Sequence, residues 1–130
     1  MADTFSKKLI AQYFSNLPYV AENNKWKAYY DEELDNFYFT SPKLSKESSL
    51  YSLNNEISLY LTSKGVVEGI FIEYFTSNFL QHEKAFSKFL ELLKKGKKSE
   101  EKKNQQSIYE KALITHVMTE FQKVNPPANI

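Results

Sequence analysis

Residues 56–75, EISLYLTSKGVVEGIFIEYF, contain two apolar segments separated by a short turn signal. In the first segment, 56–63, every second residue is apolar, and the inward-facing set is Ile57, Leu59 and Leu61. Lys64-Gly65 supplies a tight turn, and the second segment, 66–75, is rich in β-branched and aromatic residues. The pattern predicts two antiparallel strands joined as a hairpin.

Two shorter segments upstream have a similar pattern. KWKAYY, residues 25–30, places Trp26, Ala28 and Tyr30 on one side of a strand, and NFYFT at 36–40 is a further candidate strand. Pro42 ends this strand, and the serine- and lysine-rich residues 41–49 are typical of a loop. Four strands that follow one another through short connections predict an antiparallel meander.

Helical periodicity flanks the strands on both sides. Residues 4–17 predict an amphipathic helix that Pro18 ends, and residues 77–93 predict a second helix. Residues 94–106 are lysine-rich and predict a solvated linker, after which residues 107–130 predict a C-terminal amphipathic helix. The predicted fold is therefore α+β: an N-terminal helix, a four-stranded meander and two C-terminal helices. The predicted units are a domain at 1–93, the linker at 94–106 and the helix at 107–130.

Composition limits the classes of protein that this chain can be. The 130 residues have the length of a single domain, with 42% apolar residues, 25% charged residues and a net charge of +1. The chain has no cysteine, which excludes disulfides, zinc–thiolate sites and thiol catalysis. All 17 basic residues are lysine. Nucleic-acid binding is therefore less expected, because arginine supplies the bidentate contacts that grip phosphate and read guanine.

The sequence has no signal for a membrane or for secretion. No apolar run reaches the ~18 residues that a transmembrane helix needs. The N-terminal segment MADTFSKKLIAQYF has an early acidic residue and no continuous apolar stretch, unlike a signal peptide. We therefore expect a cytoplasmic protein.

An acidic cluster lies between the first two predicted strands, in YYDEELDNFYF at residues 29–39. Asp31 and Asp35 can accept hydrogen bonds from backbone N–H groups of a turn, while Glu32 and Glu33 face water. A catalytic pair would require one desolvated carboxyl group, and a calcium loop would require a different ligand spacing. A structural turn is the favoured interpretation over a metal site, a catalytic site or an acidic contact for a basic partner.

Residues 27–75 carry short motifs that point to a known family. They are YDEELDNFY at 30–38, NEISL at 55–59 and GVVEGIFI at 65–72. The segment resembles a small prokaryotic domain of unknown function that begins with a Tyr-Asp-x-Glu-x-Asp-x-x-Tyr hairpin and ends in a turn followed by V-x-G-I-E-I. The resemblance implies a compact meander without known catalysis, in a family often found beside toxin-like genes. The chain departs from the family in its longer loop at 41–52 and in both helical flanks.

The two histidines give no recognisable catalytic or metal motif. His82-Glu83 lacks the second histidine, four residues on, that a zinc protease helix requires, and His116 lies on the apolar side of the last predicted helix. We therefore expect no metal and no cofactor. One alternative is a small enzyme whose acids are gathered by the fold, the candidates being Asp31, Asp35, Glu73 and His82. Another is a weak lysine-based nucleic-acid binder that uses the interrupted run at 94–103.

Two surfaces are candidates for binding a partner. On the predicted sheet, Tyr29, Tyr38, Tyr60 and Phe71 fall opposite an inward set, Trp26, Phe37, Leu59 and Ile70. An antiparallel sheet often leaves one face polar and wet. Aromatic residues on both faces therefore predict either helices covering both faces or a docking surface.

The last predicted helix offers the second surface, with an apolar stripe of Ile108, Leu113, Val117 and Phe121. We favour docking of this stripe on a partner or a second copy over docking on its own sheet. The predicted function is a non-enzymatic regulatory module that sequesters or scaffolds another protein, in an antitoxin-like or anti-sigma-like role. The predicted partner is another protein or a second copy of the chain, with nucleic acid unlikely and no membrane.

Overall fold

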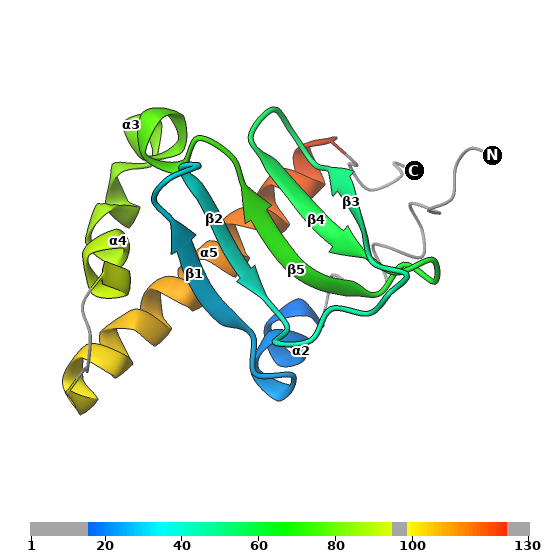
Figure 1. Cartoon of the computed structure of the whole chain (residues 1–130), viewed down its shortest axis with the longest axis horizontal. Helices are drawn as coiled ribbons and strands as arrows, with labels where there is room; N and C mark the ends of the chain where they lie inside the picture. Colours follow the sequence, from blue (N-terminus) through cyan, green and yellow to red (C-terminus); the bar gives the residue numbers. More distant parts are fainter. Residues whose placement is uncertain (1–15, 95–98, 125–130) are drawn as a thin grey trace.

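The computed structural model describes residues 16–94 and 99–124, which form an α+β fold (Figure 1). A short helix precedes a five-stranded antiparallel sheet, and a run of short helices leads to one long helix. The elements before and within the sheet are α2 (Leu17–Asn23), β1 (Lys27–Asp31), β2 (Asn36–Thr40), β3 (Ser49–Ser52), β4 (Ile57–Leu61) and β5 (Val67–Ile72). Those after it are η1 (Phe75–Phe79), α3 (Leu80–His82), η2 (Lys84–Phe86), α4 (Ser87–Lys94) and α5 (Glu100–Val124).

The strands follow the order β1-β2-β5-β4-β3, so the prediction of a four-stranded meander is wrong. Ser49–Ser52 forms an edge strand against β4. The sequence predicted these residues to belong to the loop that follows Pro42. The sequence SLYS is too short for alternation to reveal a strand. The β2–β3 connection crosses to the far edge, and β5 lies between β2 and β4. In this central position the backbone groups of the apolar strand β5 find partners on both sides.

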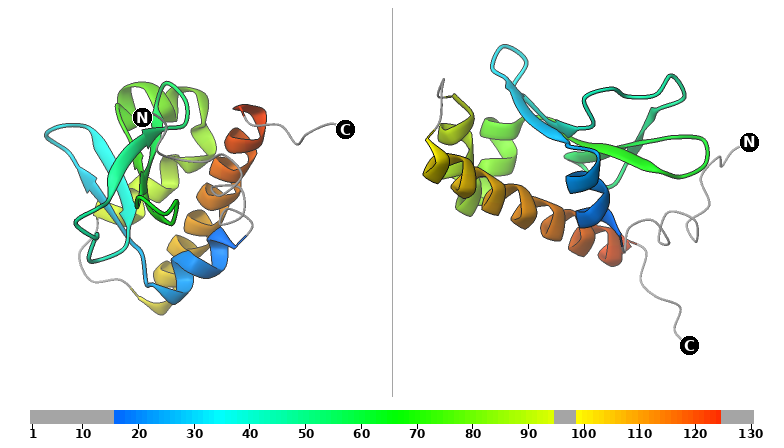
Figure 2. Two further views of the ribbon diagram at one scale, coloured as in Figure 1. Left: turned by 90° about the vertical axis from the view of Figure 1, so that its right-hand side faces the viewer. Right: turned by 90° about the horizontal axis from the view of Figure 1, so that it is seen from below.

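The core lies between one face of the sheet and the helices (Figure 2). The strands alternate as the sequence predicts: Trp26, Phe37, Leu59 and Ile70 are all buried on the helix side. Phe37 stacks on Phe75 at 4.7 Å between ring centroids, which joins β2 to the segment after β5. The inward set predicted for the sheet is confirmed.

Helix α5 packs on its own chain. Leu113, Val117 and Phe121 are buried in the same cluster as the sheet residues, and Tyr109 stacks on Phe89 of α4 at 5.7 Å. The apolar stripe therefore docks within the monomer, contrary to the preference for a partner. The physical reason is that burying each large side chain is worth about 1.5–3 kcal/mol, and the sheet offers an apolar face next to it.

The predicted boundaries of the helices also change. Helix α5 begins at Glu100, so most of the predicted linker is helical, and 95–98 lie outside the described residues. Ser99 caps this helix: its side-chain Oγ accepts from the backbone N–H of Lys102 at 3.2 Å. Glu100 and Glu101 in the first turn complement the positive end of the helix dipole.

The helix predicted at 77–93 is interrupted, and η1 starts earlier than predicted, at Phe75. Glu83, with φ −120° and ψ 64°, breaks helical geometry between α3 and η2. The helix predicted at 4–17 lies, apart from its last two residues, outside the described residues. Pro18 occupies the first turn of α2, where its missing N–H costs nothing.

Candidate functional site

The sheet face opposite the helices carries a row of aromatic side chains. Tyr29 and Tyr38 stack across β1 and β2 at 6.1 Å between centroids, and Tyr38 contacts Phe71 of β5 at 5.2 Å. The strand register explains this row, because Tyr29 pairs with Tyr38 and Tyr38 pairs with Phe71. Tyr60 follows on β4, opposite Gly69. The four sheet residues predicted as partner-binding candidates therefore share one face.

No helix among the described residues covers this open face. The helices α2, α4 and α5 all lie on the other side of the sheet in both views of Figure 2. Tyr29 is 61% exposed, and Leu50 on the edge strand β3 is half exposed. Of the two explanations for aromatic residues on both faces, coverage of both by the described helices is ruled out.

The four residues predicted as an apolar stripe on the last helix do not all have the same exposure. Leu113, Val117 and Phe121 are buried in the core, whereas Ile108 is 65% exposed. Three of the four residues are thus absent from the surface in this structure. Alternation along strands separated buried from exposed positions, but helical periodicity could not show what the stripe would cover.

The hairpin between β1 and β2 is a turn. Asp31 Oδ1 accepts from the backbone N–H of Leu34 at 3.3 Å, as expected for an aspartate that closes a turn. Asp35 was expected to do the same locally, but its carboxylate instead accepts hydrogen bonds from Tyr30, Thr76 and Ser77 at 2.7–3.1 Å. It joins the hairpin to the start of η1, a contact that no local pattern could have revealed.

The surroundings of the Asp35 carboxyl group favour its ionised form. Burial alone raises its pKa, but hydrogen bonds from Thr76, Tyr30 and Ser77 outweigh this effect and hold the pKa well below its ordinary value. Its two oxygens already accept five hydrogen bonds. A carboxylate so occupied is a structural anchor, because proton transfer to a substrate would require breaking these bonds.

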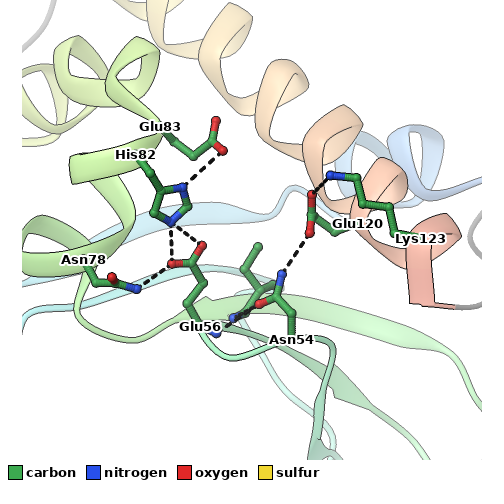
Figure 3. Close-up of polar contacts among 8 residues, drawn as sticks. Asn54, Glu56, Asn78, His82, Glu83, Glu120 and Lys123 are labelled. Carbon is green, nitrogen blue, oxygen red and sulfur yellow. Dashed lines mark hydrogen bonds and ion pairs between the residues drawn. The ribbon is translucent and has the colours of Figure 1, made fainter.

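A second polar network lies where α3 meets the β3–β4 turn (Figure 3). His82 Nε2 lies 2.8 Å from both carboxylate oxygens of Glu56, and His82 Nδ1 lies 3.3 Å from Glu83 Oε2. Asn78 Nδ2 also donates to Glu56 Oε1 at 2.7 Å. The Glu56 side chain is only 10% exposed, while that of His82 is 49% exposed.

The same network reaches α5 through Asn54. Its Oδ1 accepts from the backbone N–H groups of Glu56 and Ile57, which closes the turn before β4. Its Nδ2 donates to Glu120 Oε1 at 3.2 Å, and the other oxygen of Glu120 pairs with Lys123 Nζ at 2.9 Å. Asn54 therefore fixes the β3–β4 turn against the long helix.

The chemistry available at His82 is limited by its partners. The hydrogen bond that His82 donates to the Glu56 carboxylate raises the pKa of His82, burial opposes this effect, and Glu83 adds to the increase. Both ring nitrogens face carboxylates, so the imidazolium form is favoured and neither nitrogen is left as a free base. The adjoining hollow of about 270 Å³ is lined by Asn54, Asn55, Glu56, Asn78 and His82. The network therefore has a structural role: it joins the β3–β4 turn to α3 and to α5.

The dispersed acids proposed for an enzyme are not joined by any hydrogen bond in the described part of the chain. Asp35 contacts η1, while His82 contacts Glu56, a residue outside the predicted set. Glu73 contributes its backbone N–H, which donates to Glu56 O at 3.1 Å. Among residues 16–94 and 99–124, no group of three acidic or histidine side chains could hold a metal ion.

A cavity of about 350 Å³ lies between α2 and α5, on the helix side of the sheet. Trp26, Phe39 and Ile114 form much of its apolar lining. Trp26 Nε1 has no hydrogen-bond partner, although the side chain is buried and its ring packs edge-on against Phe39 at 5.4 Å. The nitrogen atom itself is enclosed by protein and is not open to the cavity.

His116 occupies an inner position, as predicted for a core or interface-edge residue. It is half-buried and packs against Phe79 and Phe86 at 5.7 and 6.1 Å between centroids. These two aromatic neighbours belong to η1 and η2, the short helices that follow β5. It is therefore a packing residue between α5 and the preceding short helices.

No family model, curated protein or solved structure matches this chain. The resemblance of residues 27–75 to a prokaryotic family therefore stays a prediction. None of the described helices is both long and apolar enough to cross a membrane.

Proposed function

We propose that this protein is a non-enzymatic regulatory module that binds a partner protein through the open sheet face. The single observation that carries the proposal is the aromatic row Tyr29–Tyr38–Phe71 on a face that no described helix covers. Sequestering or scaffolding of the partner, in an antitoxin-like or anti-sigma-like role, is the specific form of this function.

The composition of the face suits protein binding. Tyrosine combines a large apolar ring with a polar hydroxyl, and it is enriched among the residues that dominate binding energy at protein interfaces. Tyr38 already contacts rings on both sides, so its position changes little when a partner arrives. A rigid aromatic surface loses little conformational entropy on binding, which favours affinity.

An aromatic sheet face can also stack the bases of single-stranded nucleic acid. The acidic end of this face argues against that use. Asp31, Glu32 and Glu33 lie at the tip of the β1–β2 hairpin, at the strand end beside the aromatic row, which itself runs across the strands. These carboxylates would repel a phosphate backbone that followed the row.

Site-specific photocrosslinking in cells tests the proposal. A photoreactive phenylalanine derivative replaces Tyr29 on the open face, and the matched control replaces Tyr19, a tyrosine of α2 that is 67% exposed. We expect a discrete protein adduct from position 29, absent from position 19 and lost when Phe71→Ser is added. Equal adducts from both positions, a nucleic-acid adduct or no adduct from position 29 would overturn the proposal.

A further inference from the structure

The open sheet face carries opposite charges at its two ends. In β1, Lys27, Tyr29 and Asp31 alternate with the inward residues Ala28 and Tyr30, so these three share the open face. The lysine begins the strand, the aspartate ends it, and the exposed tyrosine lies between them. One strand therefore presents a positive charge, an aromatic ring and a negative charge in line.

The neighbouring segments repeat this polarity. The β1–β2 and β3–β4 hairpins turn at the same end of the sheet, which is the upper end in Figure 1. Acidic residues at that end are Glu32, Glu33 and Glu73. The opposite end, where β1 starts and the β4–β5 turn lies, carries Lys27 at the start of β1 and Lys43, Lys46 and Lys64 in the connections.

Two acids at the lysine end are engaged in local hydrogen bonds. Glu68 Oε1 accepts from the backbone N–H and the hydroxyl of Ser45 at 3.0 and 3.1 Å. Glu47 Oε1 accepts from the hydroxyl of Ser63 at 2.8 Å. These bonds hold the 41–48 connection and the β4–β5 turn in place, and the two carboxylates keep their charge. This end is positive because its lysines, Lys27, Lys43, Lys46 and Lys64, outnumber them.

Symmetry makes such a face complementary to itself. When two copies stack face to face, the two-fold axis lies in the interface plane. An axis parallel to the strands would place lysine ends on lysine ends. An axis perpendicular to the strands reverses the strand direction, stacks β1 on β1, and places each lysine end on the acidic end of the other copy. Charge selects this second arrangement, because like charges in contact oppose association.

We propose that a second copy of this chain occupies the open face, related by a two-fold axis perpendicular to the strands. This inference rests on the proposed function and names the partner of the same surface. Lys27 of each copy then faces Asp31 of the other, and the two Tyr29 rings meet near the axis. The two sheets pack as a sandwich, with the aromatic row of one copy lying against that of the other.

A charge-swap series on the full chain, followed by sedimentation equilibrium, tests the arrangement. Lys27→Asp places two like-charged pairs in the dimer, because the symmetric contact occurs twice. We expect the dissociation constant to rise about tenfold. Asp31→Lys should weaken association similarly, and the double variant Lys27→Asp/Asp31→Lys should restore the constant to within about threefold of the wild type. The exposed control Ile108→Lys should change nothing, and melting temperatures confirm that each variant is folded.

Three results would overturn the inference. They are a chain that stays monomeric up to about 1 mM, a dimer that is insensitive to the single substitutions, and a double variant as weak as the single ones. The crosslinked adduct at position 29 separates this inference from the proposed function. An adduct with a different protein supports the proposed function and refutes the second copy. An adduct of twice the chain mass supports the second copy and protein binding by the open face, and refutes the antitoxin-like or anti-sigma-like form of the function.

Discussion

Replacing Asp35 with asparagine tests whether the acidic hairpin is a structural anchor. Asparagine keeps the shape of the side chain and tolerates the left-handed backbone conformation found here, φ 56°. It provides one acceptor oxygen where the carboxylate provides two, and it has no charge. The amide nitrogen would face either the two donors of Thr76 or the two of Ser77. At least two of the five hydrogen bonds are therefore lost.

The expected cost follows from these bonds. Hydrogen bonds to a charged acceptor are worth about 1.5–3 kcal/mol each, but Ser77 is exposed and regains part of this from water. We expect Asp35→Asn to lower the free energy of unfolding by about 2–4 kcal/mol. That is a large share of the 5–15 kcal/mol typical of a domain.

Urea denaturation followed by the fluorescence of Trp26, the only tryptophan and a buried one, measures the loss. Asp31→Asn is the matched control, because Asp31 accepts one exposed hydrogen bond of 3.3 Å, and its loss should cost below about 1 kcal/mol. If the two variants lose the same stability, Asp35 is not an anchor, and the interpretation of this carboxylate as structural fails.

Three further outcomes are expected. The lowered pKa of Asp35 means that its contribution is complete above about pH 4 and is lost as the pH falls through the folded-state pKa. Asp35→Asn should therefore flatten the fall of the melting temperature in acid, and a parallel fall in both proteins would contradict this. The raised pKa of His82 gives the opposite sign: its stabilisation is complete below about pH 6.5 and disappears as the pH rises through the folded-state value. It is small because the side chain is half exposed, and His82→Gln should remove this pH dependence between pH 6 and 9. Deleting residues 107–130 removes four core residues that are buried in the described part of α5, and their burial is worth about 6–12 kcal/mol. Circular dichroism should therefore show an unfolded chain. A folded chain would contradict docking of α5 on its own sheet.

The parts of the fold that the sequence predicts correctly are those set by neighbouring residues. Alternation along 56–75 and 25–40 identifies four strands and the face that each residue takes, because successive side chains in a strand point to opposite sides. The same alternation placed Tyr29 and Tyr38 on the face that is found open. Local rules were sufficient here, since the pleat depends on the backbone alone.

The parts that failed depend on contacts between distant segments. Residues 49–52 become a strand because β4 offers a free edge, not because SLYS alternates clearly. Asp35 finds its partners 41 and 42 residues away, and His82 finds Glu56 26 residues away. Neither pair has a sequence spacing that would reveal it. The one local signal near this network is the pair Asn54-Asn55 before Glu56, which is typical of a turn and could have predicted the β3–β4 turn.

The open face itself results from the strand order. In the predicted four-stranded meander, the strand at 36–40 (β2) would lie beside the strand at 56–63 (β4), and Tyr38 would have Ser58 or Tyr60 as its neighbour. With β5 in the centre, Phe71 lies next to Tyr38, and three rings form a continuous row. The alternating direction of the five strands, which a five-stranded meander would share, brings the β1–β2 and β3–β4 hairpins to one end of the sheet and the β4–β5 turn to the other. Strand polarity thereby separates the acidic tips from the lysines. The aromatic row therefore depends on the central position of β5, whereas the separation of charges along the strands depends on their alternating direction. A substitution that moves β5 should therefore remove the contact between Tyr38 and Phe71 and with it the continuous row.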